Sequence, residues 1–319
     1  MTRRREDIST ERPPEPAIST APTAEPSHVP APNRRFRLSA IAFLRLGVAL
    51  IALVWAVPLG WLGLMSVTPT AEIFGSGILP SEPTFEHYEA AWNDIQMLRL
   101  LANSAIVSIA AIVGQVVLAA MAGYAFARLR FPGRDLIFGA LLVTMMVPFE
   151  VLVIPLFLAV RQIPLLGGND LFGSGGFGAI NSHFGLMLPN LITVYGVFLF
   201  RQTFLGFPRE LEEAAVVDGA SRARFFWRIL LPNARPVIIT MGMLAFIWTW
   251  NDFLWPLIIA RDVDMFTIQI GLSAFNEQFG TRWGPLMAGS VLATVPVLIA
   301  FLVSQRWVLG SFMRSGLKG

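Results

Sequence analysis

The stretch PRELEEAAVVDGASRARFFWRILLP, residues 208–232, is the longest polar interruption between the hydrophobic blocks in the C-terminal two thirds of the chain. Its many charged side chains exclude it from the apolar interior of a membrane. Pro208 suits the first turn of a helix, Gly219 suits a C-terminal cap, and Ser221 suits the N-cap of a second helix. We therefore expect two short helices joined at Gly219, the second ending at Pro232, and a partner that docks on them.

Composition places the chain among membrane proteins. It is 55% hydrophobic and 14% charged, against roughly 25% charged residues in soluble domains. The chain has no cysteine, which excludes a disulfide framework, a thiol nucleophile and a cysteine metal site. The histidines (His28, His87 and His183) lie far apart in the sequence, without the spacing of a metal site. We therefore expect no metal site and no active site of a soluble enzyme.

Six hydrophobic blocks are each long enough to cross a bilayer, for which about 20 apolar residues suffice. The predicted spans are residues 44–66, 101–126, 136–160, 184–204, 236–260 and 286–307, with a polar loop at 205–235. The sequence thus predicts an all-α membrane protein with six transmembrane helices in one domain, residues 41–319. Residues 1–40 are rich in proline and arginine and poor in aliphatic clusters, which predicts a disordered cytoplasmic tail.

Orientation follows from the basic residues, because cytoplasmic loops retain lysine and arginine. With the N-terminus inside, the segments 1–45, 128–135, 201–235 and 306–319 share one side and hold 20 of the 24 basic residues. The opposite side keeps Arg99, Arg161, Arg261 and Arg282. Both termini and the 205–235 loop are therefore predicted to be cytoplasmic. The high pI of about 9.9 reflects this topology, and we expect a lipid bilayer and no nucleic acid as a partner.

A spaced motif lies within the polar loop. Glu213-Ala214-Ala215 is followed after three residues by Gly219, and after nine more by Ile229-Leu230-Leu231-Pro232. This pattern resembles the cytoplasmic signature of ABC importer permeases. The resemblance implies that the loop forms coupling helices that dock into a groove on an ATPase subunit. The small alanines would let another protein approach, and Glu213 would pair with a cation on it. The residues assigned to this role are Glu213, Ala214, Ala215, Asp218, Gly219, Ile229, Leu231 and Pro232.

The resemblance extends from about residue 40 to the end of the chain. It includes Asn103-Ser104, YAFARLRFPG at 124–133, Val147-Pro148 with Ile154-Pro155, WNDFLWP at 250–256 and the terminal GLKG. Together these resemble the six-span permease of the carbohydrate-importing, maltose-type class, and so imply a type I ABC importer permease bundle. Arg314-Ser315-Gly316 departs from the usual small-residue run before the last Lys-Gly, a tail that in the family reaches into the ATPase dimer.

The resemblance also implies the partners of this chain. These are a second permease subunit forming a heterodimer, a dimer of ATPase subunits and an extracytoplasmic solute-binding protein, at a bacterial inner membrane. The chain has no phosphate-cradling G-x-x-x-x-G-K-[S/T] segment. We therefore expect ATP and Mg on the ATPase subunit, no cofactor on this chain, and no catalytic site of its own.

Two acidic residues, Glu150 and Asp252, lie inside predicted spans. A charge near the bilayer centre costs about 2.5–3.5 kcal/mol on insertion scales, so such residues usually face the bundle interior or a wet cavity. We assign Glu150, Trp248, Asn251 and Asp252 to a substrate path, where Trp248 and its neighbours Trp250 and Trp255 would stack on sugar rings. The alternatives are a hydrogen bond between helices for the acids and an interfacial aromatic belt for the tryptophans.

Other functions remain open at this point. An importer of a polyol or of glycerol phosphate shares these motifs, although a phosphorylated substrate favours cations in the spans, and residues 136–160 and 236–260 contain none. An ion-coupled secondary transporter would use Glu150 or Asp252 as its coupling group. A structural or signalling membrane protein would transport nothing. The motif in the polar loop favours the sugar importer, because neither of the last two classes accounts for it.

Overall fold

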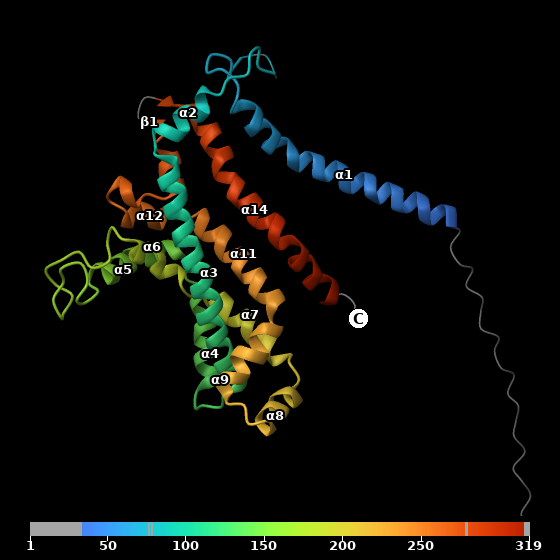
Figure 1. Cartoon of the computed structure of the whole chain (residues 1–319), viewed down its shortest axis with the longest axis vertical. Helices are drawn as coiled ribbons and strands as arrows, with labels where there is room; N and C mark the ends of the chain where they lie inside the picture. The colour runs from blue at the N-terminus through green and yellow to red at the C-terminus, as the bar shows by residue number, and fades with distance from the viewer. Residues whose placement is uncertain (1–33, 76, 78, 278–279, 316–319) are drawn as a thin grey trace, which may run out of the picture. The chain divides into compact units, whose positions relative to one another are not determined.

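The computed structural model describes residues 34–75, 77, 79–277 and 280–315, and Figure 1 shows that helices dominate this part of the chain. The only strands in these residues are β1 (Asn276–Glu277) and β2 (Gly280–Thr281), which pair antiparallel with Asn276 opposite Thr281. The all-α prediction is confirmed. The chain divides into two compact units, Met1–Ala56 and Val57–Gly319.

The described part of the first unit is the N-terminal portion of α1 (Arg34–Met65). The helix begins at Arg34, inside the range 1–40 that we predicted as a tail, whereas residues 1–33 lie outside the described residues. Within α1, the stretch Phe43–Met65 is long and apolar enough to cross a membrane. Most of its large apolar side chains are exposed, as expected for a helix in contact with lipid, although Met65 at its end is buried.

The second unit holds the remaining helices. They are α2 (Glu86–Asn93), α3 (Met97–Arg128), α4 (Arg134–Thr144), α5 (Phe149–Arg161), α6 (His183–Met187), η1 (Leu188–Asn190), α7 (Val194–Leu205), α8 (Arg209–Val217), α9 (Arg222–Phe225), η2 (Phe226–Leu230), α10 (Leu231–Asn233), α11 (Arg235–Trp250), α12 (Leu254–Ile259), η3 (Val263–Met265), α13 (Ile268–Ser273) and α14 (Trp283–Ser315).

The candidate spans are partly continuous and partly bent. Single helices of sufficient length are Phe43–Met65, Met97–Arg128 and Trp283–Trp307, close to the predicted 44–66, 101–126 and 286–307. Three further candidates are helix pairs bent by 106°, 48° and 77°, so by length and composition the described residues hold three candidate spans, or up to six if each pair is one span. The sharpest bend lies between α4 and α5, where Pro148 holds an extended backbone before α5 and cannot continue α4.

The predicted span 236–260 is not one continuous helix. α11 ends at Trp250 and α12 starts at Leu254, so Asn251 and Asp252 lie in a break between them. Hydropathy alone does not detect such a break, because the residues on both sides are equally apolar.

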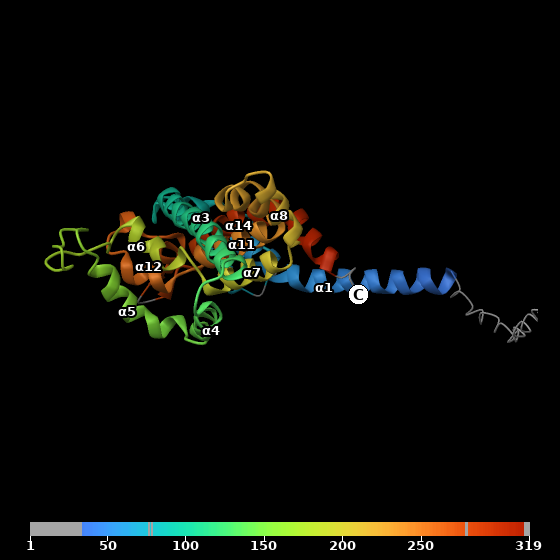
Figure 2. The same cartoon turned by 90° about the horizontal axis from the view of Figure 1, so that it is seen from below.

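Helix α3 is the centre of the second unit, and both α7 and α11 pack along it (Figures 1 and 2). The contact with α7 is close because α3 presents small residues there. A Cβ atom built on Gly123 would lie 2.7 Å from Phe200 Cβ and 2.9 Å from the Arg201 nitrogen. One turn earlier, Ala119 packs against Gly196 of α7. Small residues four apart are the usual means by which membrane helices approach closely.

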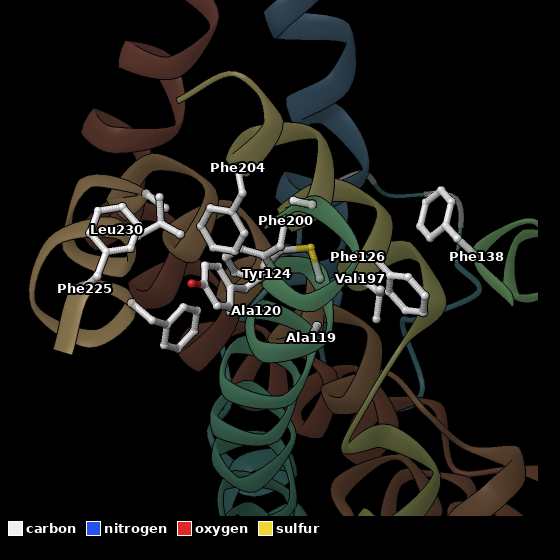
Figure 3. Packing of buried hydrophobic residues seen from close by; sticks show 14 of the residues in the cluster. Ala119, Ala120, Tyr124, Phe126, Phe138, Val197, Phe200, Phe204, Phe225 and Leu230 are labelled. Atoms are coloured by element: carbon white, nitrogen blue, oxygen red, sulfur yellow. The ribbon is translucent and has the colours of Figure 1, made fainter. Parts of the chain in front are cut away.

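The main hydrophobic cluster lies at the C-terminal end of α3. Figure 3 shows Tyr124, Phe200 and Phe204 between α3, α7 and the segment that carries Phe225 and Leu230. Part of the polar loop at 205–235 therefore belongs to the core of the bundle.

Replacing Gly123 with alanine tests the contact between α3 and α7. The added methyl group meets backbone atoms of α7 that cannot rotate away, so we expect a loss of about 1–3 kcal/mol of stability. The measurement is thermal unfolding of the purified protein in detergent. Gly139→Ala on α4 is the control, since nothing lies within 4 Å of its Cβ position, and it should unfold at the wild-type temperature or above. Equal behaviour of the two variants would contradict the close contact.

Candidate functional site

The coupling segment, defined here as residues 208–234, contains α8, α9, η2 and α10. As predicted, α8 follows Pro208, Gly219 adopts the left-handed conformation (φ +76°) just after α8, and the Ser221 hydroxyl accepts the Arg224 N–H at 3.3 Å. The prediction that Pro232 ends the second helix was wrong, because helical structure continues to Asn233. The π-helical turn η2 precedes α10, and in it the Leu231 N–H donates to the carbonyl of Phe226, five residues earlier.

The predicted coupling residues divide between two faces of the segment. Glu213, Ala214, Asp218 and Gly219 are exposed, whereas Ala215 is buried in the main cluster. Ala215 is therefore small because α8 packs on its own bundle, and our expectation that it faces another protein was wrong. The other assigned residues, Ile229, Leu231 and Pro232, are half-buried.

The outward face also carries apolar side chains that the motif did not identify. Val217 is 86% exposed and Val216 is 61% exposed, next to Glu213 on α8. Glu213 and both valines line one cavity of about 470 Å³ together with Arg209 of α8, Arg128 at the end of α3 and Arg130 just beyond it. Two adjacent valines in a charged loop are a sequence signal that we did not use. Apolar side chains that stay exposed in such a loop indicate a contact surface.

The inward face holds the coupling segment to α3 and α7. The rings of Tyr124 and Phe226 are 5.2 Å apart, and those of Phe204 and Phe226 are 6.3 Å apart, measured between centroids. Phe226 thus contacts one aromatic residue from each of the two long helices. Its neighbours Phe225 and Leu230 are buried in the same cluster (Figure 3).

Arg128, the last residue of α3, adds polar contacts to this packing. Its guanidinium donates to the carbonyl of Phe204 from Nε at 3.1 Å and from Nη2 at 2.7 Å. Nη2 also donates to the carbonyl of Phe207 at 2.6 Å, and Nη1 lies 3.5 Å from a carboxylate oxygen of Glu212. The side chain is 5% exposed. Arg128 therefore ties the C-terminal end of α7 and the start of the coupling segment to the end of α3.

The predicted substrate-path residues do not form one cluster. Asn251 lies in the break after α11, where its Nδ2 donates to the Ile247 carbonyl at 2.7 Å and its Oδ1 lies 3.5 Å from Gln269 Nε2 of α13. Asp252 accepts the Trp255 N–H at 3.4 Å and so stabilises the first turn of α12. Glu150 is exposed in the first turn of α5, and Trp248 is 76% exposed on α11.

Two of the tryptophans proposed to stack on sugars are core residues. Trp250 is buried and its indole N–H donates to the Ala293 carbonyl at 3.1 Å, which holds α11 against α14. Trp255 is fully buried and donates to the Gly185 carbonyl at 3.0 Å. A large ring with a satisfied N–H stabilises a helix contact and is closed to a ligand, so our expectation for Trp250 and Trp255 was wrong.

Asn251 does line a cavity of about 320 Å³ between α11, α13 and α14. Its polar partners there, Gln269, Ser290 and Thr294, were not identified from the sequence. Single neutral polar residues in apolar helices give little signal, because most of them only bond the preceding turn. No group of three histidine or acidic side chains that could hold a metal ion occurs in the part of the chain that the structure describes.

Arg128→Lys tests the contacts of Arg128 with α7. Lysine keeps the charge but has no fork that can bond two carbonyls, so about 1.5–3 kcal/mol of local stability should be lost. We expect faster trypsin cleavage within residues 201–224 than in the unaltered chain, measured on membranes by mass spectrometry. Arg130→Lys is the control, since Arg130 is exposed and makes no side-chain hydrogen bond among the described residues. Equal cleavage of both variants would contradict the role of Arg128.

Comparison with known proteins places this architecture in a family. The family model described as "Binding-protein-dependent transport system inner membrane component" matches residues 115–311, which include the coupling segment. The arabinooligosaccharides transport system permease protein AraQ of Halalkalibacterium halodurans is 34% identical over 281 residues, covering 86% of this chain and 96% of that protein.

Two further relatives are named for other substrates. The diacetylchitobiose uptake system permease protein NgcG of Streptomyces coelicolor is 32% identical over 88% of each chain. The sn-glycerol-3-phosphate transport system permease protein UgpE of Yersinia pestis is 34% identical over 68% of this chain and 73% of that protein. The fold also matches a chain in the crystal structure of a bacterial ABC transporter involved in the import of the acidic polysaccharide alginate. That match has a TM-score of 0.70 and 23% identity, and it covers 87% of this chain and 99% of that one.

The predicted permease architecture is thus confirmed, and a match over more than half of the chain shows the family. The chain belongs to the binding-protein-dependent transport system inner membrane components.

Proposed function

We propose that this chain is the membrane-spanning permease subunit of an ATP-driven importer of neutral sugars. It forms half of the translocation path together with a second permease subunit, and an extracytoplasmic solute-binding protein delivers the substrate. Family membership and the names of two relatives, which transport arabinooligosaccharides and diacetylchitobiose, support this proposal. The membership also makes an ion-coupled secondary transporter or a non-transporting membrane protein a poor account of the chain.

The observation that carries the proposal is the two-sided coupling segment. Its outer face presents Glu213, Val216 and Val217, while its inner face is part of the core of α3 and α7. A protein that binds the outer face and moves it must also move these two helices. Because the chain has no phosphate-binding loop, we assign ATP and Mg to a dimer of separate ATPase subunits that docks here.

The distribution of basic residues supports the orientation of this arrangement. The coupling segment, the loop at 128–135 and both termini belong to the side that holds 20 of the 24 basic residues. We propose that this side is cytoplasmic, where the ATPase binds. The C-terminal tail that we expect to contact the ATPase, residues 314–319, starts in the last turn of α14, and its residues 316–319 lie outside the described residues.

Import of a glycerol phosphate is the second candidate function. The relative named for sn-glycerol-3-phosphate transport is as identical to this chain as the arabinooligosaccharide permease, although over a shorter region. Uptake assays with both classes of substrate in the assembled complex decide between the two.

Two substitutions at Gly219 test the coupling role. Valine disfavours the left-handed backbone of this residue, whereas asparagine tolerates it, and a Cβ atom here meets nothing within 4 Å. In proteoliposomes with the ATPase and the binding protein, we expect Gly219→Val to reduce sugar-stimulated ATP hydrolysis at least tenfold. Gly219→Asn should retain most of it. Coupling at the wild-type level in Gly219→Val, with normal membrane insertion, would contradict the proposal.

A second pair of substitutions tests the docking face of α8. Glu213→Gln removes a charge beside Val216 and Val217, whereas Glu210→Gln removes an exposed charge from the first turn of the same helix. We expect Glu213→Gln to weaken ATPase binding to the permease about tenfold, an effect typical of a contact charge, and Glu210→Gln to change it less than twofold. The measurement is co-purification at rising salt concentration. If both variants bind the ATPase with equal affinity, Glu213 makes no contact with the ATPase.

A further inference from the structure

The cavity between α11, α13 and α14 has a polar lining without formal charge. Asn251, Gln269, Ser290 and Thr294 supply its polar atoms, and Leu272, Ala293 and Val297 supply its apolar ones. Its volume of about 320 Å³ lies at the lower end of the roughly 300–1,000 Å³ found for small-ligand pockets. A sugar ring fits this size, with polar and apolar edges to match.

Both hydroxyl groups of the cavity already donate their hydrogen atoms to backbone carbonyl groups. Ser290 donates to the Leu286 carbonyl at 2.7 Å, and Thr294 donates to the Ser290 carbonyl at 2.7 Å. A hydroxyl has one hydrogen but two lone pairs. Both oxygens can therefore accept hydrogen bonds from a ligand, and neither can donate one without losing its backbone partner.

The two amide groups are oriented in the same way. Asn251 Nδ2 donates to the Ile247 carbonyl at 2.7 Å, and Gln269 Nε2 donates to the Trp250 carbonyl at 3.3 Å. A backbone carbonyl can only accept, so these contacts fix the nitrogen of each amide toward the backbone. Gln269 Oε1 and one lone pair of Asn251 Oδ1 remain as acceptors, since Oδ1 already lies 3.5 Å from Gln269 Nε2, and Asn251 Nδ2 keeps one further N–H.

A cavity in which free acceptors outnumber free donors favours a ligand that donates. Sugar hydroxyl groups are donors, whereas a phosphate or carboxylate brings negative charge and needs donors or cations. Asp252, which follows Asn251 in the sequence but does not line the cavity, is the acidic residue nearest to it along the chain. Arg235, the arginine of α11, lies at the other end of this 16-residue helix, roughly 24 Å away.

We propose that this cavity is a subsite for a neutral sugar, in which Asn251, Gln269, Ser290 and Thr294 accept hydrogen bonds from sugar hydroxyl groups and disfavour phosphate esters. The apolar side chains of Leu272 and Val297 suit the C–H face of the ring. The inference rests on the proposed function and names the part of the path where this chain discriminates among substrates.

Uptake by the assembled complex in proteoliposomes, with saturating binding protein, is the first test. The probes are radiolabelled arabinotriose, diacetylchitobiose and sn-glycerol 3-phosphate. Ser290→Ala combined with Thr294→Val removes two acceptors at nearly constant volume, and should slow neutral sugar uptake about five- to tenfold. Thr240→Val is the matched control, because Thr240 of α11 bonds the Pro236 carbonyl in the same way but does not line the cavity. It should retain the wild-type rate.

The outcomes separate the two proposals. A complex that imports glycerol phosphate but no neutral sugar would overturn the proposed function. A complex that imports a sugar equally well with the double variant and with Thr240→Val would overturn the subsite alone.

A second measurement does not depend on knowing the substrate. Because the chain has no cysteine, Thr294→Cys introduces a single thiol into the cavity. A methanethiosulfonate with a trimethylammonium group should label it at least tenfold faster than one with a sulfonate group, after correction for their rates with free thiol. Thr240→Cys serves as the control. No labelling at Cys-substituted Thr294, or equal rates for the two reagents, would overturn the acceptor-lined subsite.

Discussion

The hydrogen bonds from Arg128 to the carbonyl groups of Phe204 and Phe207 are the contacts on which the coupling end of this molecule depends. The last carbonyl groups of a helix have no partner within it, so a buried arginine from another helix that bonds one of them joins the two ends. Phe226 packs against aromatic residues of the same two helices. The coupling segment is therefore attached to α3 and α7 by polar and apolar contacts, although its outer face is free to bind a partner.

The close packing of α3 and α7 extends this attachment along the bundle. Gly123 allows the α7 backbone to approach α3 within the space that a side chain would fill. Such a contact resists sliding of the two helices past each other, since sliding would bring larger residues into the contact. At the C-terminal end of α11, the end away from the coupling segment in the sequence, the break in the backbone places Asn251 beside Gln269 of α13.

Much of this was predictable from sequence, because its causes are local. Charge density, Gly219 and Ser221 identify the two helices of the coupling segment, and apolar runs identify the regions of the candidate spans. The direction in which a side chain points depends on packing against residues that are distant in the sequence. Ala214 and Ala215 read alike, yet one is exposed and the other packs in the core. Trp250 and Trp255 lie beside polar residues in the sequence, but their indole groups bond carbonyls 43 and 70 residues away. The sequence does not reveal that Asn251 shares a cavity with Gln269, Ser290 and Thr294, because only folding brings these residues together.

Photo-cross-linking from position 217 tests the central claim most directly. A photoreactive amino acid replaces Val217, the most exposed apolar residue of the coupling segment, in the complex with its ATPase. We predict a covalent adduct with the ATPase whose yield changes on addition of ATP, and no such adduct from the same substitution at Trp248, which is similarly exposed on α11. An absence of the adduct at position 217 in an intact complex, or an equal yield at both positions, would contradict the account.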